Sequence, residues 1–125
     1  MNQAPKYIRL PFTLTNNNDG QGRHWGNSAK TRKQMERDLR KMGLVFEPMR
    51  EKVTVTVVRI LGKGQRLWDS SSRGRGNYKQ LEDAMVACGW FTDDSPKYIK
   101  NTVFLEDDTQ RKNGSAIDIY IERHF

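Results

Sequence analysis

The sequence predicts an α/β (α+β) two-layer fold, with a small mixed β-sheet and two helices in the order β-α-β-α-β-β. Three observations support this prediction. Short segments of alternating or β-branched apolar residues are typical of strands, two longer segments repeat apolar residues at helical spacing, and turn-forming residues separate them. With 125 residues, the chain is expected to form a single domain, residues 1–125.

Four segments have the pattern of strands. In residues 7–15 the apolar side chains fall on one face, and Pro11, which has no N–H to donate, places this strand at an edge of the sheet. Residues 52–61 are β-branched on both faces, which favours an interior strand. Residues 97–105 and 115–123 are expected to be the last two strands, and the connection EDDTQRKNG between them is typical of a hairpin loop.

Residues 25–42 are expected to form the first helix, because apolar and basic residues recur there at helical spacing. The apolar arc consists of Trp25, Ala29, Met35, Leu39 and Met42, and the basic arc consists of Lys30, Lys33, Arg37 and Lys41. The basic arc could lie along a phosphate backbone or could be a solvated helix face, and the sequence leaves both interpretations open. Arg23 and His24 stand just before the helix, where backbone N–H groups favour anions, and are further candidates for phosphate contacts.

The second helix is expected to run from Asn77, which is suited to the N-cap, to Gly89. Its buried stripe is predicted to consist of Tyr78, Leu81, Met85 and Cys88. Lys79 and Asp83 stand four residues apart and share a different face of this helix. Trp90-Phe91 follow the helix and are expected to pack into the core.

The formal charge of +7 is unevenly distributed. Residues 1–80 carry 17 Lys and Arg against 6 Asp and Glu, whereas residues 81–125 carry 5 against 9. A basic body with an acidic cluster suits a protein that binds a polyanion and keeps carboxylates for another task, although a solvated basic surface has the same composition. Cys88 is the only cysteine, which excludes an intrachain disulfide and a thiol cluster for zinc, and no apolar run approaches the roughly 20 residues of a membrane span. A cytoplasmic location is therefore expected.

Carboxylates flank the second helix on both sides. Asp69 precedes it in the glycine-rich loop of residues 62–76, and Asp93 and Asp94 follow it. Such aspartates can simply form a solvated turn. If they converge they repel one another, and a hard divalent cation such as Mg²⁺ or Mn²⁺ relieves that cost. Asp69, Asp93 and Asp94 are therefore candidate metal ligands, and Lys79 is a candidate to neutralise charge at a scissile phosphodiester.

Two segments of the chain carry a resemblance to a known family. The segment from Lys79 to Asp94 reads K-x-x-x-D-A-M-x-x-x-G-W-x-x-D-D, and the segment from Arg23 to Lys33 reads RHWGNSAKTRK. With the order of the elements, these motifs resemble RusA, the phage-derived family of Holliday junction resolvases. Its members carry an acidic D-x-D-N segment, a lysine, a D-A-L helix segment, a glycine and a paired Asp-Asp. The resemblance extends from about Tyr7 to the end of the chain.

The resemblance implies a homodimeric, Mg²⁺-dependent endodeoxyribonuclease that acts on four-way DNA junctions in recombination and repair. The two-fold symmetry of a dimer would match the symmetry of the junction. By position, Asp94 corresponds to the essential second aspartate of the family's pair and Asp93 to its neighbour. Lys79 corresponds to the helix lysine and Asp83 to the helix aspartate. Asp94, Asp69 and Lys79 are the predicted catalytic residues.

The sequence departs from the family at the D-x-D segment. When the D-A-M segment is aligned without gaps, the two acidic positions fall on Arg73 and Arg75, and only Asp69 remains nearby. Either a rearranged loop brings in Asp69 as the missing ligand, or the metal site is lost and the two arginines bind phosphate directly. The first alternative predicts a junction endonuclease, and the second predicts a protein that binds branched or duplex DNA without cutting it. A basic α/β protein that binds a protein partner is the third interpretation.

Overall fold

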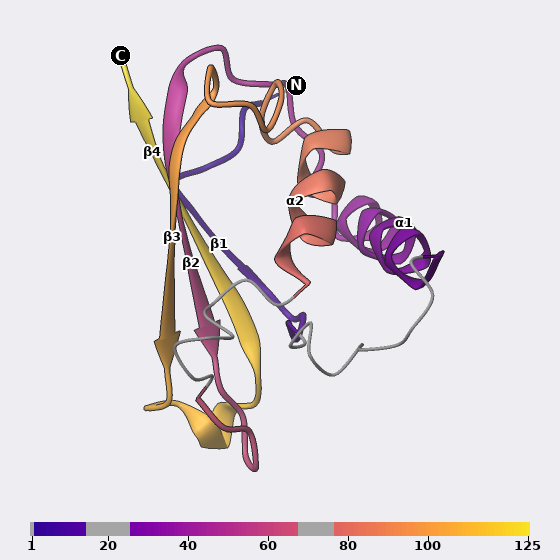
Figure 1. Ribbon diagram of the computed structural model, residues 1–125, viewed down its shortest axis with the longest axis vertical. Helices are drawn as coiled ribbons and strands as arrows, with labels where there is room; N and C mark the ends of the chain where they lie inside the picture. Colours follow the sequence, from indigo (N-terminus) through magenta and orange to yellow (C-terminus); the bar gives the residue numbers. More distant parts are fainter. Residues whose placement is uncertain (1, 15–25, 68–76) are drawn as a thin grey trace.

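The predicted two-layer architecture is confirmed by the computed structural model, which describes residues 2–14, 26–67 and 77–125. A four-stranded sheet forms one layer, and both helices lie to one side of it, with α1 packed on α2 (Figure 1). The elements are β1 (Tyr7–Leu10), α1 (Gly26–Lys41), β2 (Lys52–Ile60), α2 (Tyr78–Ala87), β3 (Ile99–Asp107), the 3₁₀ turn η2 (Arg111–Asn113) and β4 (Ala116–His124).

The positions of the first two strands in the sheet are as predicted. The order across the sheet is β1-β4-β2-β3, so β1 is at an edge and β2 is in the interior. Pro11 directly follows β1, and a residue without an N–H is tolerated where no further strand pairs. The sheet is mixed, because β2 pairs parallel with β3, whereas β4 pairs antiparallel with both β1 and β2.

The predicted hairpin between the last two strands is wrong. β3 and β4 are not neighbours in the sheet, because β2 lies between them. α2 carries the chain back to the end of the sheet where β2 began, so β3 pairs parallel with β2, and β4 then pairs antiparallel with β2 on its other side. Asn113-Gly114 still end the η2 turn, with Gly114 at a φ of 87°, but this turn joins strands that do not pair with each other.

One apolar core lies between the sheet and the helices. The inward faces of the strands contribute Ile8, Leu10, Val53, Val55, Val57, Ile117, Ile119 and Ile121, and the helices contribute Met35, Leu39, Tyr78, Leu81, Ala84, Met85 and Cys88. The stripe predicted for the second helix is therefore buried. Met42 departs from the predicted arc of the first helix, since it follows the last helical residue and remains exposed.

Two smaller expectations can also be compared with the structure. Asn77 occupies the N-cap position of α2, but its side chain makes no capping hydrogen bond. No helix among residues 2–14, 26–67 and 77–125 is both long and apolar enough to cross a membrane.

Candidate active site and nucleic-acid interface

The fold brings Lys79 and Asp94 into direct contact. Lys79 lies in the first turn of α2, and Asp94 lies in the turn between α2 and β3, 15 residues further along the chain. The ammonium Nζ of Lys79 donates a hydrogen bond to Oδ2 of Asp94, and the two groups form an ion pair. The lysine and the second aspartate of the Asp-Asp pair, which the sequence singled out separately, thus form one cluster.

The turn that carries Asp94 is fixed to the body of the protein by the residues that precede it. Trp90 is fully buried, and its indole Nε1 donates a hydrogen bond of 2.9 Å to the carbonyl oxygen of Leu44. Phe91 is buried and forms a β-bridge with Met49, and Thr92 Oγ1 donates a 2.7 Å hydrogen bond to the Met49 carbonyl. Because these contacts hold the turn against the segment before β2, the backbone at Asp94 has a defined position beside α2.

Two more carboxylates of α2 approach the same ammonium group. Asp83 Oδ1 lies 3.1 Å from Nζ of Lys79, and Glu82 Oε1 lies 3.4 Å from it. The pairing of Lys79 with Asp83 agrees with their predicted spacing of one helical turn. The side chain of Glu82 is only 12% exposed, whereas that of Lys79 is 55% exposed, so the cluster extends from the protein surface to the edge of the core.

The charges in this cluster shift one another's pKa values. The ammonium group of Lys79 lowers the pKa of the Asp94 carboxyl, and the Asp94 carboxylate in turn raises the pKa of Lys79. Burial raises the pKa of the Glu82 carboxyl, although Lys79 acts in the opposite direction. At neutral pH, Asp94 is therefore ionised and Lys79 is protonated.

The described carboxylates do not by themselves complete a metal site. Asp93 Oδ1 accepts a 3.3 Å hydrogen bond from the backbone N–H of Ser95. Asp93 and Asp94 offer the oxygen ligands that Mg²⁺ prefers, but the cation that Asp94 binds here is the ammonium of Lys79. Across residues 2–14, 26–67 and 77–125, no group of three or more His, Cys, Asp or Glu side chains is arranged to hold a metal ion.

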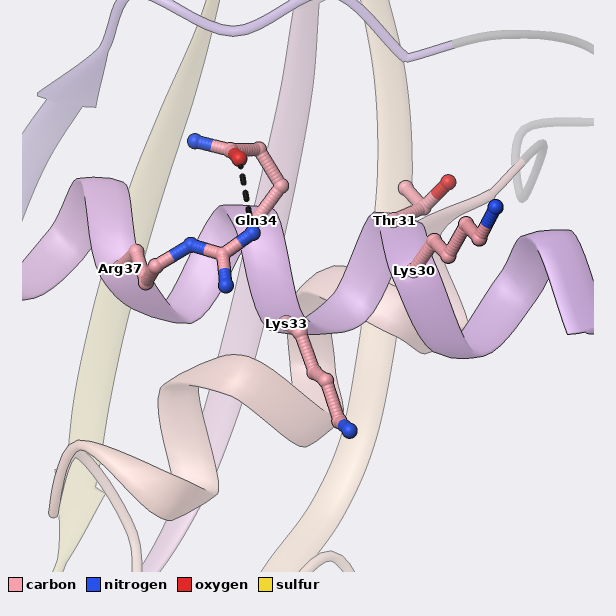
Figure 2. A pocket seen from close by; sticks show the side chains of 5 residues that line it. All are labelled: Lys30, Thr31, Lys33, Gln34 and Arg37. Atoms are coloured by element: carbon pink, nitrogen blue, oxygen red, sulfur yellow. Dashed lines mark hydrogen bonds between the residues drawn. The ribbon is translucent and has the colours of Figure 1, made fainter.

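The basic arc predicted for the first helix lies on an exposed face of α1. Lys30, Lys33 and Arg37 line an open hollow together with Thr31 and Gln34 (Figure 2). Arg37 turns toward Gln34 and donates a 3.0 Å hydrogen bond to its Oε1, whereas Lys30 and Lys33 extend in different directions from the helix. Neither lysine has an ion-pair or hydrogen-bond partner in the part of the chain that the structure describes.

Five of the predicted site residues lie outside the described residues. These are Arg23, His24, Asp69, Arg73 and Arg75. Their predicted roles, including the proposed approach of Asp69 to Asp94, therefore remain predictions.

Sequence reasoning missed Glu82 as a member of the cluster. The signal was its position three residues after Lys79, which places both side chains on neighbouring parts of the helix surface. A second signal was its location next to the buried Leu81, where a carboxylate is only partly solvated.

Comparison with known proteins adds no assignment to this geometry. No protein-family model matches the chain, and no curated protein matches it either. The resemblance to RusA therefore depends on the motifs themselves.

Proposed function

We propose that this chain is a RusA-like endodeoxyribonuclease that binds four-way DNA junctions and hydrolyses phosphodiesters in them, with Mg²⁺ or Mn²⁺ as cofactor. The observation that carries the proposal is the contact between Lys79 and Asp94. The resemblance requires a lysine and an aspartate from opposite ends of one helix to act at one phosphate, and only the fold can bring these two groups together.

The proposed roles follow from the charges of the chain's own side chains. Lys30, Lys33 and Arg37 bind backbone phosphates on the exposed face of α1 and hold the DNA in place. Lys79 neutralises charge that develops at the scissile phosphate, and Asp94 with Asp93 supplies carboxylate oxygens. A bound Mg²⁺ would provide a polarised water and stabilise the leaving oxygen, and Asp69 is the residue proposed to complete its ligands. A homodimer of this chain would place two such sites on symmetrically related strands.

The test is cleavage of a synthetic four-way junction in Mg²⁺ or Mn²⁺. The expected result is that wild type cuts the junction, and that Asp94→Asn and Asp69→Asn bind it without cutting. A protein that binds no DNA even at low salt would refute the proposal in full.

A second function is favoured by the state of Asp94 itself. Its carboxylate is already paired with Lys79, which competes with a metal ion for the same oxygens. With Arg73 and Arg75 at the positions of the family's acidic pair, the chain would then bind branched or duplex DNA without cutting it. Tight junction binding with no cleavage in either metal would select this function over the first.

The role of the basic arc can be tested separately in both cases. Lys33→Glu combined with Arg37→Glu is expected to weaken DNA binding and to lower the salt dependence of log K by about 0.9 for each phosphate that is no longer neutralised. The matched control is Lys100→Glu with Lys112→Glu, which makes the same charge change at exposed residues of β3 and η2. If the two double variants weaken DNA binding equally, the basic residues of α1 contribute only to the net charge of the protein and do not form a specific contact surface.

A further inference from the structure

Three carboxylates surround the ammonium group of Lys79. A protonated lysine carries three N–H donors. Nζ of Lys79 contacts Asp94 Oδ2, Asp83 Oδ1 at 3.1 Å and Glu82 Oε1 at 3.4 Å. Nζ donates hydrogen bonds to Asp94 and Glu82 and forms an ion pair with Asp83, so a phosphate that approaches Lys79 has to compete with these carboxylates.

The charge of the cluster leads to the same conclusion. Lys79 contributes one positive charge, and its three partners contribute three formal negative charges, so the closed cluster repels a phosphate rather than attracting it. Lys30 and Lys33 on α1 differ in this respect, because no carboxylate within the described part of the chain pairs with them.

We propose that the Lys79–Asp94 pair is an autoinhibitory contact that opens when DNA binds. In the free protein Asp94 holds Lys79. In the complex a backbone phosphate takes the ammonium group, and the Asp94 carboxylate is released at the same time. Asp83 and Glu82, on the same helix as Lys79, keep the ammonium close to the site during the exchange. This inference rests on the proposed binding of DNA and adds how that binding changes the site.

The exposure of the pair makes the exchange accessible. The side chain of Lys79 is 55% exposed and that of Asp94 is 33% exposed, so both groups are partly solvated when they separate. An exposed ion pair of this kind shifts an equilibrium by only about 1.5- to 5-fold. By thermodynamic linkage, a phosphate that takes Lys79 away from Asp94 raises the affinity of Asp94 for a cation by the same factor. A cation bound at Asp94 raises the affinity of Lys79 for phosphate equally.

The experiment is a double-mutant cycle for junction binding in EDTA, where no cleavage interferes. Wild type, Asp94→Asn, Lys79→Met and the double variant are compared over a series of salt concentrations. Lys79→Met is expected to lower the salt dependence of log K by about 0.9, the value for one phosphate that is no longer neutralised. Asp94→Asn removes the competitor for the ammonium group, so it is expected to tighten DNA binding in the protein that has Lys79. This gain in affinity should be about 1.5- to 5-fold larger than the effect of Asp94→Asn in the Lys79→Met variant.

The sign of the coupling separates the proposal from a pair that stays closed. If the pair stays closed, the ammonium group of Lys79 screens the DNA from the negative charge of Asp94. Asp94→Asn would then tighten DNA binding less in the protein that has Lys79 than in the Lys79→Met variant. That sign, or an unchanged salt dependence in Lys79→Met, would overturn the proposal while leaving DNA binding itself intact. Glu122→Gln is the control, since it removes an exposed carboxylate on β4 and its effect is expected to be the same in both backgrounds. Absence of wild-type binding would overturn this proposal together with the proposed function.

Discussion

Substitution of Gly89 by alanine is expected to destabilise this protein strongly, because two costs combine at this position. Gly89 follows α2 at a φ of +83°, which costs a non-glycine residue about 1–2 kcal/mol. An added Cβ would also lie 1.9 Å from the carbonyl oxygen of Phe46, which is backbone and cannot turn aside. Overpacking of this kind adds roughly 1–3 kcal/mol, so the expected decrease in the free energy of unfolding is about 2–5 kcal/mol, from a total of about 5–15 kcal/mol for a typical domain.

The same change has a consequence for the candidate site. The backbone N–H of Phe46 donates a 2.8 Å hydrogen bond to the carbonyl oxygen of Cys88, and a displaced Phe46 segment would break it. Trp90, which binds the same connecting segment at Leu44, follows directly. We therefore expect Gly89→Ala to loosen the turn that carries Asp94 as well as to destabilise the fold.

The matched control is Gly43→Ala, and the assay is urea unfolding followed by tryptophan fluorescence. Gly43 also has a positive φ, of +74°, but an added Cβ would meet nothing within 4 Å. It should therefore show only the backbone cost of about 1–2 kcal/mol. Gly89→Ala is expected to lose a further ~1–3 kcal/mol. Because the urea midpoint is the free energy of unfolding divided by an m-value of about 1–3 kcal/mol/M, its midpoint should be clearly lower than that of Gly43→Ala. Equal midpoints for the two variants would refute the argument that the close approach of Phe46 requires glycine.

Three further predictions concern the core and the cluster. Leu81→Ala removes a fully buried side chain and should lower the free energy of unfolding in urea by about 2–5 kcal/mol. The control Leu105→Ala changes a residue that is 52% exposed and should alter this free energy by less than about 0.5 kcal/mol. Similar losses in the two variants would contradict the assignment of Leu81 to the core. Because burial raises the pKa of Glu82, its ionised form opposes folding, so the free energy of unfolding falls as the pH rises above the ordinary value of 4.5 and through the pKa in the folded state. Glu82→Gln should therefore be more stable than wild type at neutral pH and equal to it below about pH 4, and a gain that does not change with pH would exclude this cause. Cys88 is buried, so a disulfide reagent should reach its thiol only as fast as the protein opens, and the raised pKa of the thiol slows the reaction further. Rapid reaction of the native protein would show that Cys88 is accessible.

Most of the secondary structure follows from local pattern. Alternation and helical spacing predicted four strands and two helices, and the structure has all six. Pro11 correctly predicted an edge position for the first strand, and the β-branched residues 52–61 correctly predicted an interior position for the second. Both signals are local, because a missing N–H or a β-branched side chain affects the strand in which it occurs. The contact between Lys79 and Asp83 was also local, since residues four apart on a helix are neighbours.

The hairpin was wrong because strand pairing is not a local property. Asn113-Gly114 favours a tight turn wherever it occurs, but the dipeptide does not determine which strands lie on either side of it. The crossover through α2 places β3 beside β2, and β4 lies on the other side of β2, between β2 and β1. The sequence of turn residues is the same for both arrangements.

The sequence by itself determined which elements form, which faces they bury, and which charged residues belong to the same motif. Only the tertiary structure decided that Lys79 touches Asp94, and that this contact joins the carboxylates of α2 to the turn before β3. The physical reason is range: spacing along a helix or strand fixes neighbours within about one turn, whereas the position of Asp94 depends on how Trp90 and Phe91 pack against a segment about 40 residues earlier in the chain.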